Sequence, residues 1–176
     1  VDVSAYEMAI TTGEGNDTIT VVSPDDNKVG NGDGNTQALI NIATGAGEDT
    51  VVLGKDTEGL TALAGSSIGG ENVTLRVENQ SDLRAAELEG ISSVVLNDDA
   101  DSDDDFALTV TDEQFSSIGA GNFSVEGAAF NNDAQVKVVV NESTSLTNLG
   151  VEDLPTGIDL QLELADGVTL EMTAEQ

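Results

Sequence analysis

The sequence contains no cysteine and no histidine, and only 3% of its residues are aromatic. Disulfides and thiol catalysis are therefore excluded, and so are zinc sites of the usual kind. The lack of histidine removes the side chain most often used for acid–base catalysis. Because aromatic residues are so scarce, small β-branched and aliphatic side chains must build the interior, which favours a thin, layered core.

Basic residues are also scarce: five Lys and Arg stand against 34 Asp and Glu, for a net charge of −29. No basic stripe exists to meet phosphate, so we expect no nucleic-acid partner. Self-repulsion at this level destabilises a compact state, and either disorder or cation binding relieves it. Apolar runs at residues 51–53, 94–96 and 136–140 are too regular for a disordered chain, so cation binding is favoured.

No apolar stretch approaches the length of a membrane span, and no signal peptide is visible. The chain begins at Val1 rather than Met, which indicates processing or a piece of something longer. Its 176 residues leave room for one domain or two small ones.

Alternation of apolar and polar residues predicts strands along most of the chain. They are expected at residues 6–10, 18–22, 39–42, 50–53, 72–77, 92–96, 106–111, 123–125, 135–140, 159–164 and 168–172. Short helices are predicted at residues 58–64 and 81–88, the second capped by Ser81 and Asp82. Another helical turn is expected after Thr111, which forms a capping-box pattern with Gln114. Residues 165–167 are either a hairpin-like turn or a corner of a solenoid.

An internal echo links residues 107–114 with residues 168–176, because in both a strand runs into Thr-x-Glu-Gln. It predicts a strand–turn–short-helix unit that recurs along the chain. Chance similarity is the alternative, since short polar motifs recur easily.

Two glycine-rich stretches, residues 12–20 and 44–52, share the pattern G-x-G-x-D followed by a β-branched strand. The glycines permit tight turns with positive φ, and Asp17 and Asp49 place a carboxylate at each turn. Carboxylate and carbonyl oxygens are the ligands of Ca²⁺. The alternative is a pair of Gly/Asn β-turns that hold no ion.

Both stretches resemble G-G-x-G-x-D-x-U-x, the calcium-binding nonapeptide of RTX proteins. They depart from it at the first position, where Thr12 and Thr44 replace Gly. In that family, successive turns of a parallel β-roll trap calcium between them. The resemblance implies that Asp17 and Asp49 are carboxylate ligands and that the glycine turns supply carbonyl ligands. The family shows longer uninterrupted runs, so the expected β-roll is limited to the N-terminal third.

Two more acidic stretches offer oxygens. Residues 31–35 alternate oxygen-bearing side chains like the opening of an EF-hand, although Ile42 stands where the bidentate Glu belongs, so a calcium loop and a plain turn are both open. The acidic run at residues 98–105 either binds calcium weakly or is a solvated loop. The complete set of candidate metal ligands is Gly13, Gly15, Asn16, Asp17, Asn31, Asp33, Asn35, Gly45, Gly47, Asp49, Asp99, Asp101 and Asp103.

The expected fold is all-β: a parallel β-solenoid, or β-roll, with short helical turns at its corners, and a β-sandwich as the alternative. Residues 1–57 would form a glycine-rich, calcium-binding, β-roll-like segment, and residues 58–176 a β-solenoid-like repeat segment. We expect no enzymatic activity, because neither a P-loop nor a Rossmann fingerprint is present and one Tyr with no Trp could hardly line sugar subsites.

Glycine turns, acid excess, absence of cysteine and the Thr-x-Glu-Gln repeat together resemble the RTX-type adhesins and calcium-dependent S-layer proteins of bacteria. The resemblance implies a Ca²⁺-stabilised structural protein, secreted by a type I system to the extracellular space or cell surface. Such a protein would assemble with itself into a surface layer or filament through edge strands or solenoid ends. The alternatives are an adhesin module that binds a glycan or host surface, and a spacer within a giant RTX adhesin.

Overall fold

The computed structural model describes residues 2–3, 7–22, 36–55, 59–97, 107–126 and 134–172. Strands hold 60% of the described residues and helices 13%, which confirms that the described part of the chain is mostly β. The strands are β1 (Asp2–Val3), β2 (Glu7–Thr11), β3 (Thr18–Val22), β4 (Thr36–Ala43), β5 (Asp49–Lys55), β6 (Leu60–Ala62), β7 (Ser66–Val77), β8 (Ser81–Asp82), β9 (Ala86–Asn97), β10 (Ala107–Thr111), β11 (Phe123–Glu126), β12 (Gln135–Val140), β13 (Thr144–Ser145), β14 (Asp159–Leu164) and β15 (Leu170–Glu171). The helices are α1 (Asp112–Ile118) and α2 (Leu146–Leu149), with 3-10 turns η1 (Ala120–Asn122) and η2 (Val151–Asp153).

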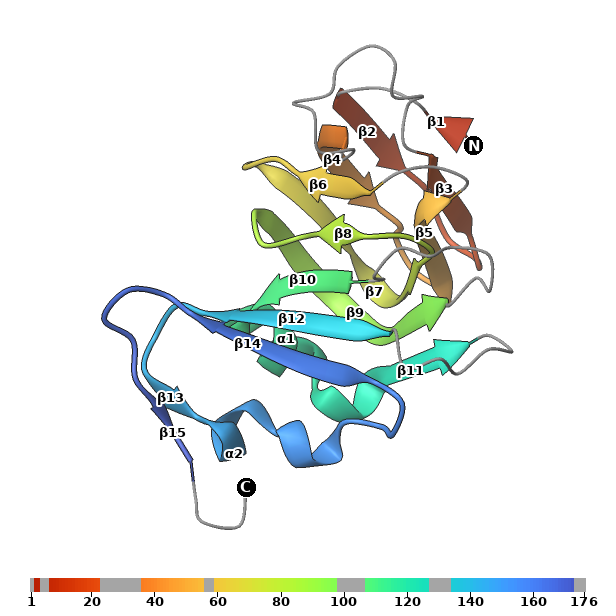
Figure 1. The fold of residues 1–176 in the computed structure, drawn as a ribbon. Coiled ribbons are helices and arrows are strands. Elements are labelled where there is room, and N and C mark those ends of the chain that lie inside the picture. The colour runs from red at the N-terminus through yellow and green to blue at the C-terminus, as the bar shows by residue number, and fades with distance from the viewer. Residues whose placement is uncertain are drawn as a thin grey trace.

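Every strand pairing in the described part of the chain is parallel, as expected. One open sheet of 13 strands contains all of them except β13 and β15, which pair with each other. Figure 1 shows the strands stacked broadly in chain order, from the red N-terminal strands to the blue C-terminal ones.

The large sheet consists of three ladders of parallel strands. The first ladder runs from the start of β4 through β6, β8, β10 and β12 to β14. The second joins β2 to the rest of β4 and to the first halves of β7 and β9. The third joins β1, β3 and β5 to the second halves of β7 and β9 and then to β11. Three long strands, β4, β7 and β9, therefore each take part in two ladders.

Columns of aliphatic side chains fill the interior, because inward positions of successive strands fall in register. Across the third ladder the column is Ile19, Val51, Leu75, Val94 and Phe123, each at most 2% exposed. Buried residues form one hydrophobic cluster that extends from the first glycine-rich segment into the C-terminal part of the chain. This layered core of small side chains is the kind that the scarcity of aromatic residues predicted.

The short helices predicted at residues 58–64 and 81–88 are wrong. Leu60 and Ala62 both point inward from β6, which pairs with β4 and β8. Ser81 is not a helix cap, since its hydroxyl donates to the carbonyl of Asn79 and the residue lies in β8. Pairing of these short segments with neighbouring strands outweighs their weak helical preference.

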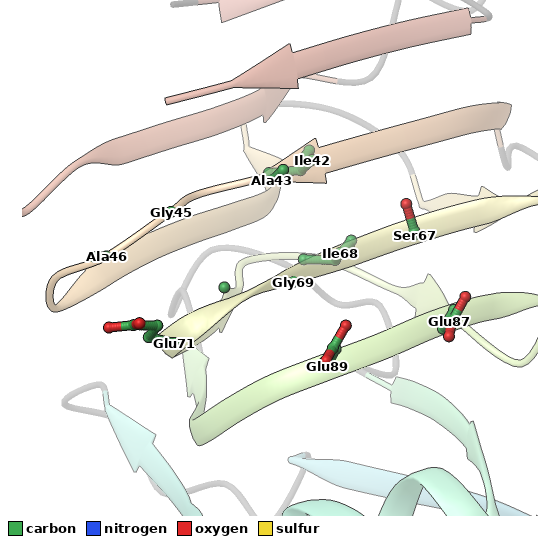
Figure 2. A pocket seen from close by; sticks show the side chains of 11 residues that line it. Ile42, Ala43, Gly45, Ala46, Ser67, Ile68, Gly69, Glu71, Glu87 and Glu89 are labelled. Carbon is green, nitrogen blue, oxygen red and sulfur yellow. The ribbon is translucent and has the colours of Figure 1, made fainter. Parts of the chain in front are cut away.

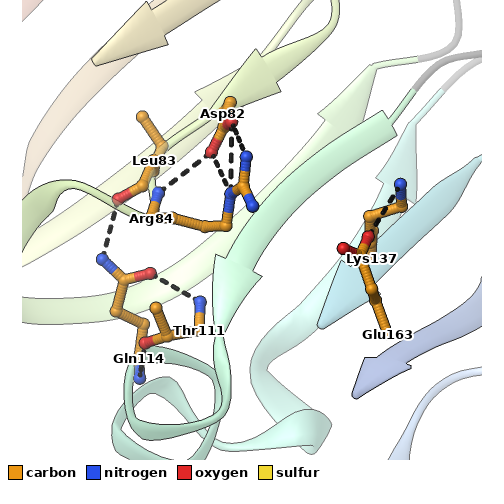
Figure 3. A network of polar contacts seen from close by, with 7 residues as sticks. All are labelled: Asp82, Leu83, Arg84, Thr111, Gln114, Lys137 and Glu163. Atoms are coloured by element: carbon orange, nitrogen blue, oxygen red, sulfur yellow. Dashed lines mark hydrogen bonds and ion pairs between the residues drawn. The ribbon is translucent and has the colours of Figure 1, made fainter. Parts of the chain in front are cut away.

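The helix predicted after Thr111 is confirmed. Thr111 Oγ1 accepts from the Gln114 backbone N–H, and Gln114 Oε1 accepts from the Thr111 N–H, a complete capping box. Gln114 Nε2 also donates to the carbonyl of Leu83 (2.8 Å; Figure 3) and to that of Ala86 (2.7 Å). One side chain thus both caps α1 and ties it to the preceding layer.

Residues 165–167 do not join a hairpin, because β14 pairs with β12 and β15 with β13, both in parallel. The second copy of the internal echo is described only as far as Met172, where it contains β15, because residues 173–176 lie outside the described part. In the described part, no helix is long and apolar enough to cross a membrane.

The three basic side chains that the structure describes are all engaged in ion pairs. Arg76 contacts Glu78 (3.0 Å) and Glu126 (2.7 Å), and the hydrogen bond that it donates to Glu126 raises the pKa of the guanidinium. The other two pairs are Arg84 with Asp82 (2.7 Å) and Lys137 with Glu163 (3.4 Å) (Figure 3). Most acidic residues must therefore go without a basic partner from this chain, which contains five basic residues in all.

Candidate metal site at the stacked glycine turns

The two glycine turns lie one above the other and are joined by backbone hydrogen bonds. Thr12 N donates to the carbonyl of Ala43 (2.9 Å) and Gly15 N to that of Ala46 (2.9 Å), while Ala46 N donates to Gly13 O (3.3 Å). Similar local sequences thus form equivalent turns in consecutive layers, 32 residues apart.

Close stacking explains why the second turn, at residues 44–52, needs its glycines. Gly45 has φ +82°, and a Cβ atom there would overlap the carbonyl oxygen of Gly13. Gly47 has φ +143°, and its Cβ would overlap the carbonyl oxygen of Gly15. Gly13 itself has open space around it. The second turn is therefore restricted to glycine at these positions both by its positive φ angles and by its contact with the first turn.

Threonine at the first motif position has a physical role that the RTX pattern did not predict. Thr12 Oγ1 donates to the carbonyl of Thr44 (2.6 Å), and Thr44 Oγ1 donates to the carbonyl of Gly69 (3.4 Å). Thr44 is fully buried. The two hydroxyls link three successive layers at the point where the family has glycine.

Asp49 is the central acidic residue of the stacked turns. It is 1% exposed, and its Oδ1 accepts from the backbone N–H of Asp17 at 2.9 Å. Its second oxygen, Oδ2, is buried without a hydrogen-bond partner. Leaving a buried charged oxygen unpaired costs about 1–3 kcal/mol or more. In the next two layers the same position holds Val73 and Ile91, so this column carries no acid in the two layers after the second glycine turn.

The structure brings together the seven candidate ligands of the two turns: Gly13, Gly15, Asn16, Asp17, Gly45, Gly47 and Asp49. Asp17 is half-buried, and its carbonyl accepts from Thr50 N (2.8 Å). Asn16 Oδ1 accepts from Glu48 N (3.1 Å), so this oxygen already helps to join the turns. The other six candidates, Asn31, Asp33, Asn35, Asp99, Asp101 and Asp103, lie outside the described residues.

The column of glycines continues beyond the predicted turns. A Cβ atom on Gly70 would overlap Thr44 Oγ1, and one on Gly90 would overlap the carbonyl oxygen of Gly70. Sequence reasoning missed these two because neither belongs to a G-x-G-x-D pattern. The available signal was glycine in front of a predicted strand, at residues 72–77 and again at residues 92–96.

An acidic groove of about 560 Å³ lies beside the second turn, on the outer side of β4, β7 and β9. Glu87 and Glu89 project from β9 toward it, and Glu71 lies at its end near Ala46 (Figure 2). No basic side chain lines the groove. Its field attracts cations to the neighbourhood of the turns.

The donor set fits a hard cation in part. Asp49 Oδ2 is a carboxylate oxygen without a hydrogen-bond partner. Gly45 and Gly47 lie close to Asp49 in the sequence. Each of their carbonyl oxygens has two lone pairs, so it can accept a hydrogen bond and still coordinate an ion. Within the described ranges, no three acidic side chains converge on one point. A cation here would therefore rely on carbonyl oxygens as much as on carboxylates, as the glycine-turn pattern implies.

Residues 65–69 match the G-x-S-x-G pattern of serine hydrolases, but the context of a nucleophile is missing. Ser67 lies inside β7 instead of at a strand-to-helix turn, and its hydroxyl donates to Asn41 Oδ1 (3.0 Å). The chain has no histidine to activate it.

No family model, curated protein or solved structure matches this chain.

Proposed function

We propose that the protein is a calcium-stabilised extracellular structural protein, built as a parallel β-solenoid that assembles with itself at the cell surface. The observation that carries the proposal is the buried carboxylate of Asp49, with Oδ2 unpaired, between two stacked glycine turns. A bound cation would remove the cost of that unpaired oxygen and hold consecutive layers together.

Calcium is the cation that the donors favour, because the oxygens are carboxylates and carbonyls and no nitrogen or sulfur ligand is at hand. Asp49 and Asp17 would hold the ion, with carbonyls of the glycine turns as further ligands. When bound, Ca²⁺ supplies positive charge between layers. Asp49 positions the Asp17 backbone, and the threonine hydroxyls keep the turns in register.

A solenoid is supported by the three parallel ladders, since β4, β7 and β9 each pass from one ladder into the next. Residues 1–57 would be its calcium-binding part and residues 58–176 its continuation. The large acid excess supports a place outside the cell, where calcium is plentiful enough to neutralise carboxylates and drive folding. Secretion by a type I system remains the route implied by the RTX resemblance.

Assembly is preferred over adhesion because recognition sites are rich in Trp and Tyr, and this chain has no Trp and one Tyr. Light scattering and electron microscopy in millimolar calcium, a concentration typical of extracellular modules, test the choice. Ordered sheets, fibres or discrete oligomers support assembly. A chain that stays monomeric in calcium and binds a glycan array would favour the adhesin instead.

Calorimetric titration of Ca²⁺ into chelator-treated protein tests the site itself. We expect Asp49→Asn, which keeps the shape and removes the charge, to lower the affinity about tenfold or more, equivalent to at least ~1.4 kcal/mol. Glu48→Gln is the matched control, since it removes an exposed charge one residue away and leaves the backbone bond to Asn16 possible. Equal binding by Asp49→Asn and the unmodified chain would rule the site out.

A further inference from the structure

Strand β14 ends the first ladder and offers an open edge. Within the described residues it pairs with β12 and with no strand on its other side. An open edge presents unpaired backbone N–H and C=O groups, which another strand can satisfy. The rest of the ladder consists of strands paired on both sides, apart from its first member, the start of β4.

The side chains of β14 are built for a covered position. Leu160, Leu162 and Leu164 continue the columns of Val136, Val138 and Val140, which are fully buried. In β14 the leucines are partly exposed, and Leu164 reaches 43%. At the N-terminal end Met8, Ile19 and Val21 are at most 4% exposed, whereas Ile10 of the edge strand β2 is partly exposed, like Leu160 and Leu162. Among the described strands, the most exposed leucine that continues a buried column is therefore Leu164 of β14.

We propose that β14 binds β14 of a second copy of this chain, antiparallel, about a two-fold axis at Leu162. Directly opposed residues of an antiparallel pair share one face of the sheet, so the leucines of both copies would cover each other. Leu162 would face the partner's Leu162, and Leu160 would face the partner's Leu164.

Charge selects the same register. With the axis at Leu162, Glu163 lies opposite the partner's Gln161, and Lys137 stays paired with Glu163 in each copy (Figure 3). An axis one residue earlier would oppose Asp159 to the partner's Glu163. An axis one residue later would oppose Glu163 to the partner's Glu163. Like charges directly opposite each other destabilise a strand pair, so the Leu162-centred register is favoured over both.

Sedimentation equilibrium and light scattering on the 176-residue chain in calcium test the dimer, at about 0.15 M salt, where screening limits charge repulsion to ~8 Å. We expect a reversible dimer whose dissociation constant rises about tenfold or more in Leu164→Asp. Leu63→Asp is the matched control, since Leu63 is also exposed (38%) and is distant from β14 in the sequence. A monomer at every concentration would overturn the proposal and point to another chain segment on this edge.

Cysteine crosslinking tests the register, because the chain has no cysteine of its own. Leu162→Cys should form a disulfide-linked dimer on mild oxidation, since the axis brings residue 162 of both copies within reach. Leu160→Cys should crosslink much less, because it faces a leucine of the partner. Equal crosslinking of the two variants would overturn the two-fold register.

The dimer rests on the self-assembly in the proposed function and names the strand that carries it, but none of its contacts needs a bound cation. Failure of calcium to bind would leave the β14 interface intact. Loss of the dimer would leave the calcium response of the glycine turns intact.

Discussion

Two positions of the same motif, Gly13 and Gly45, differ in what surrounds them. A Cβ atom added to Gly13, in the first turn, would find open space. A Cβ atom added to Gly45, in the second turn, would overlap the carbonyl oxygen of Gly13. A motif read from sequence treats both glycines as equal, because the stacking partner is remote in the chain. The packing of one turn on the next decides which glycine is required.

Gly45→Ala should therefore lower the free energy of unfolding by about 2–3 kcal/mol, since it forces a side chain into positive φ and against the Gly13 carbonyl. Gly13→Ala is the matched control and should change it by less than about 1 kcal/mol. Urea denaturation followed by circular dichroism measures both. Similar losses in the two variants would contradict the stacked-turn geometry.

Thr12 offers a second test at this scale. Thr12→Val keeps the shape and removes the hydroxyl that donates to the Thr44 carbonyl, so the free energy of unfolding should fall by about 1 kcal/mol. Thr12→Ser retains the hydroxyl and should lose clearly less. The same urea titrations provide the comparison. An unchanged free energy of unfolding in Thr12→Val would show that the hydroxyl does not link the layers.

Among the elements, strands were predictable where alternation extends over several residues, and short segments were not. Residues 18–22 and 135–140 alternate clearly, and β3 and β12 have those bounds. β6 and β8 are only three and two residues long, so no local period distinguishes them from a helical turn. The strands that pair with β6 and β8 decide their conformation, and those strands are distant in the sequence.

Helix α1 was predictable because its signal is local: Thr111 and Gln114 carry the capping box. The two bonds from Gln114 to the Leu83 and Ala86 carbonyls were not, because they depend on the neighbouring layer. Gln114→Ala should lower the free energy of unfolding by about 2–3 kcal/mol, since it removes the capping-box bond to Thr111 N and leaves both carbonyls without this donor.

Glu113→Ala serves as the control for that helix, because Glu113 is exposed and lies next to Gln114. It should cost less than about 0.5 kcal/mol. Thermal unfolding of the two variants side by side separates the roles. Equal destabilisation would mean that Gln114 acts through helix propensity alone.

For the whole molecule, composition predicted the layered aliphatic core, and the glycine motif predicted which turns stack. The candidate site is only partly local: Asp17 and Asp49 were found from spacing, whereas the burial of Asp49 follows from the layers that pack around it. The open edge at β14 had no sequence signal, since Leu160, Leu162 and Leu164 alternate like any inward-facing strand.

A net charge of −29 makes ion dependence a property of the entire chain. Monovalent salt screens repulsion between carboxylates. The site proposed at Asp49 would favour a divalent cation that takes several oxygen ligands. Unfolding temperature should therefore rise with sodium chloride, and rise further with calcium at equal ionic strength. Magnesium at the same concentration should do less, because it demands stricter octahedral geometry and gives up its water reluctantly.

The most direct test is far-ultraviolet circular dichroism of the chelator-treated chain during a calcium titration. Saturable gain of β signal and of unfolding temperature, beyond that given by ionic-strength-matched sodium chloride and weakened in Asp49→Asn, is the predicted result. A spectrum and an unfolding temperature that are the same with chelator and with calcium would contradict a calcium-stabilised fold.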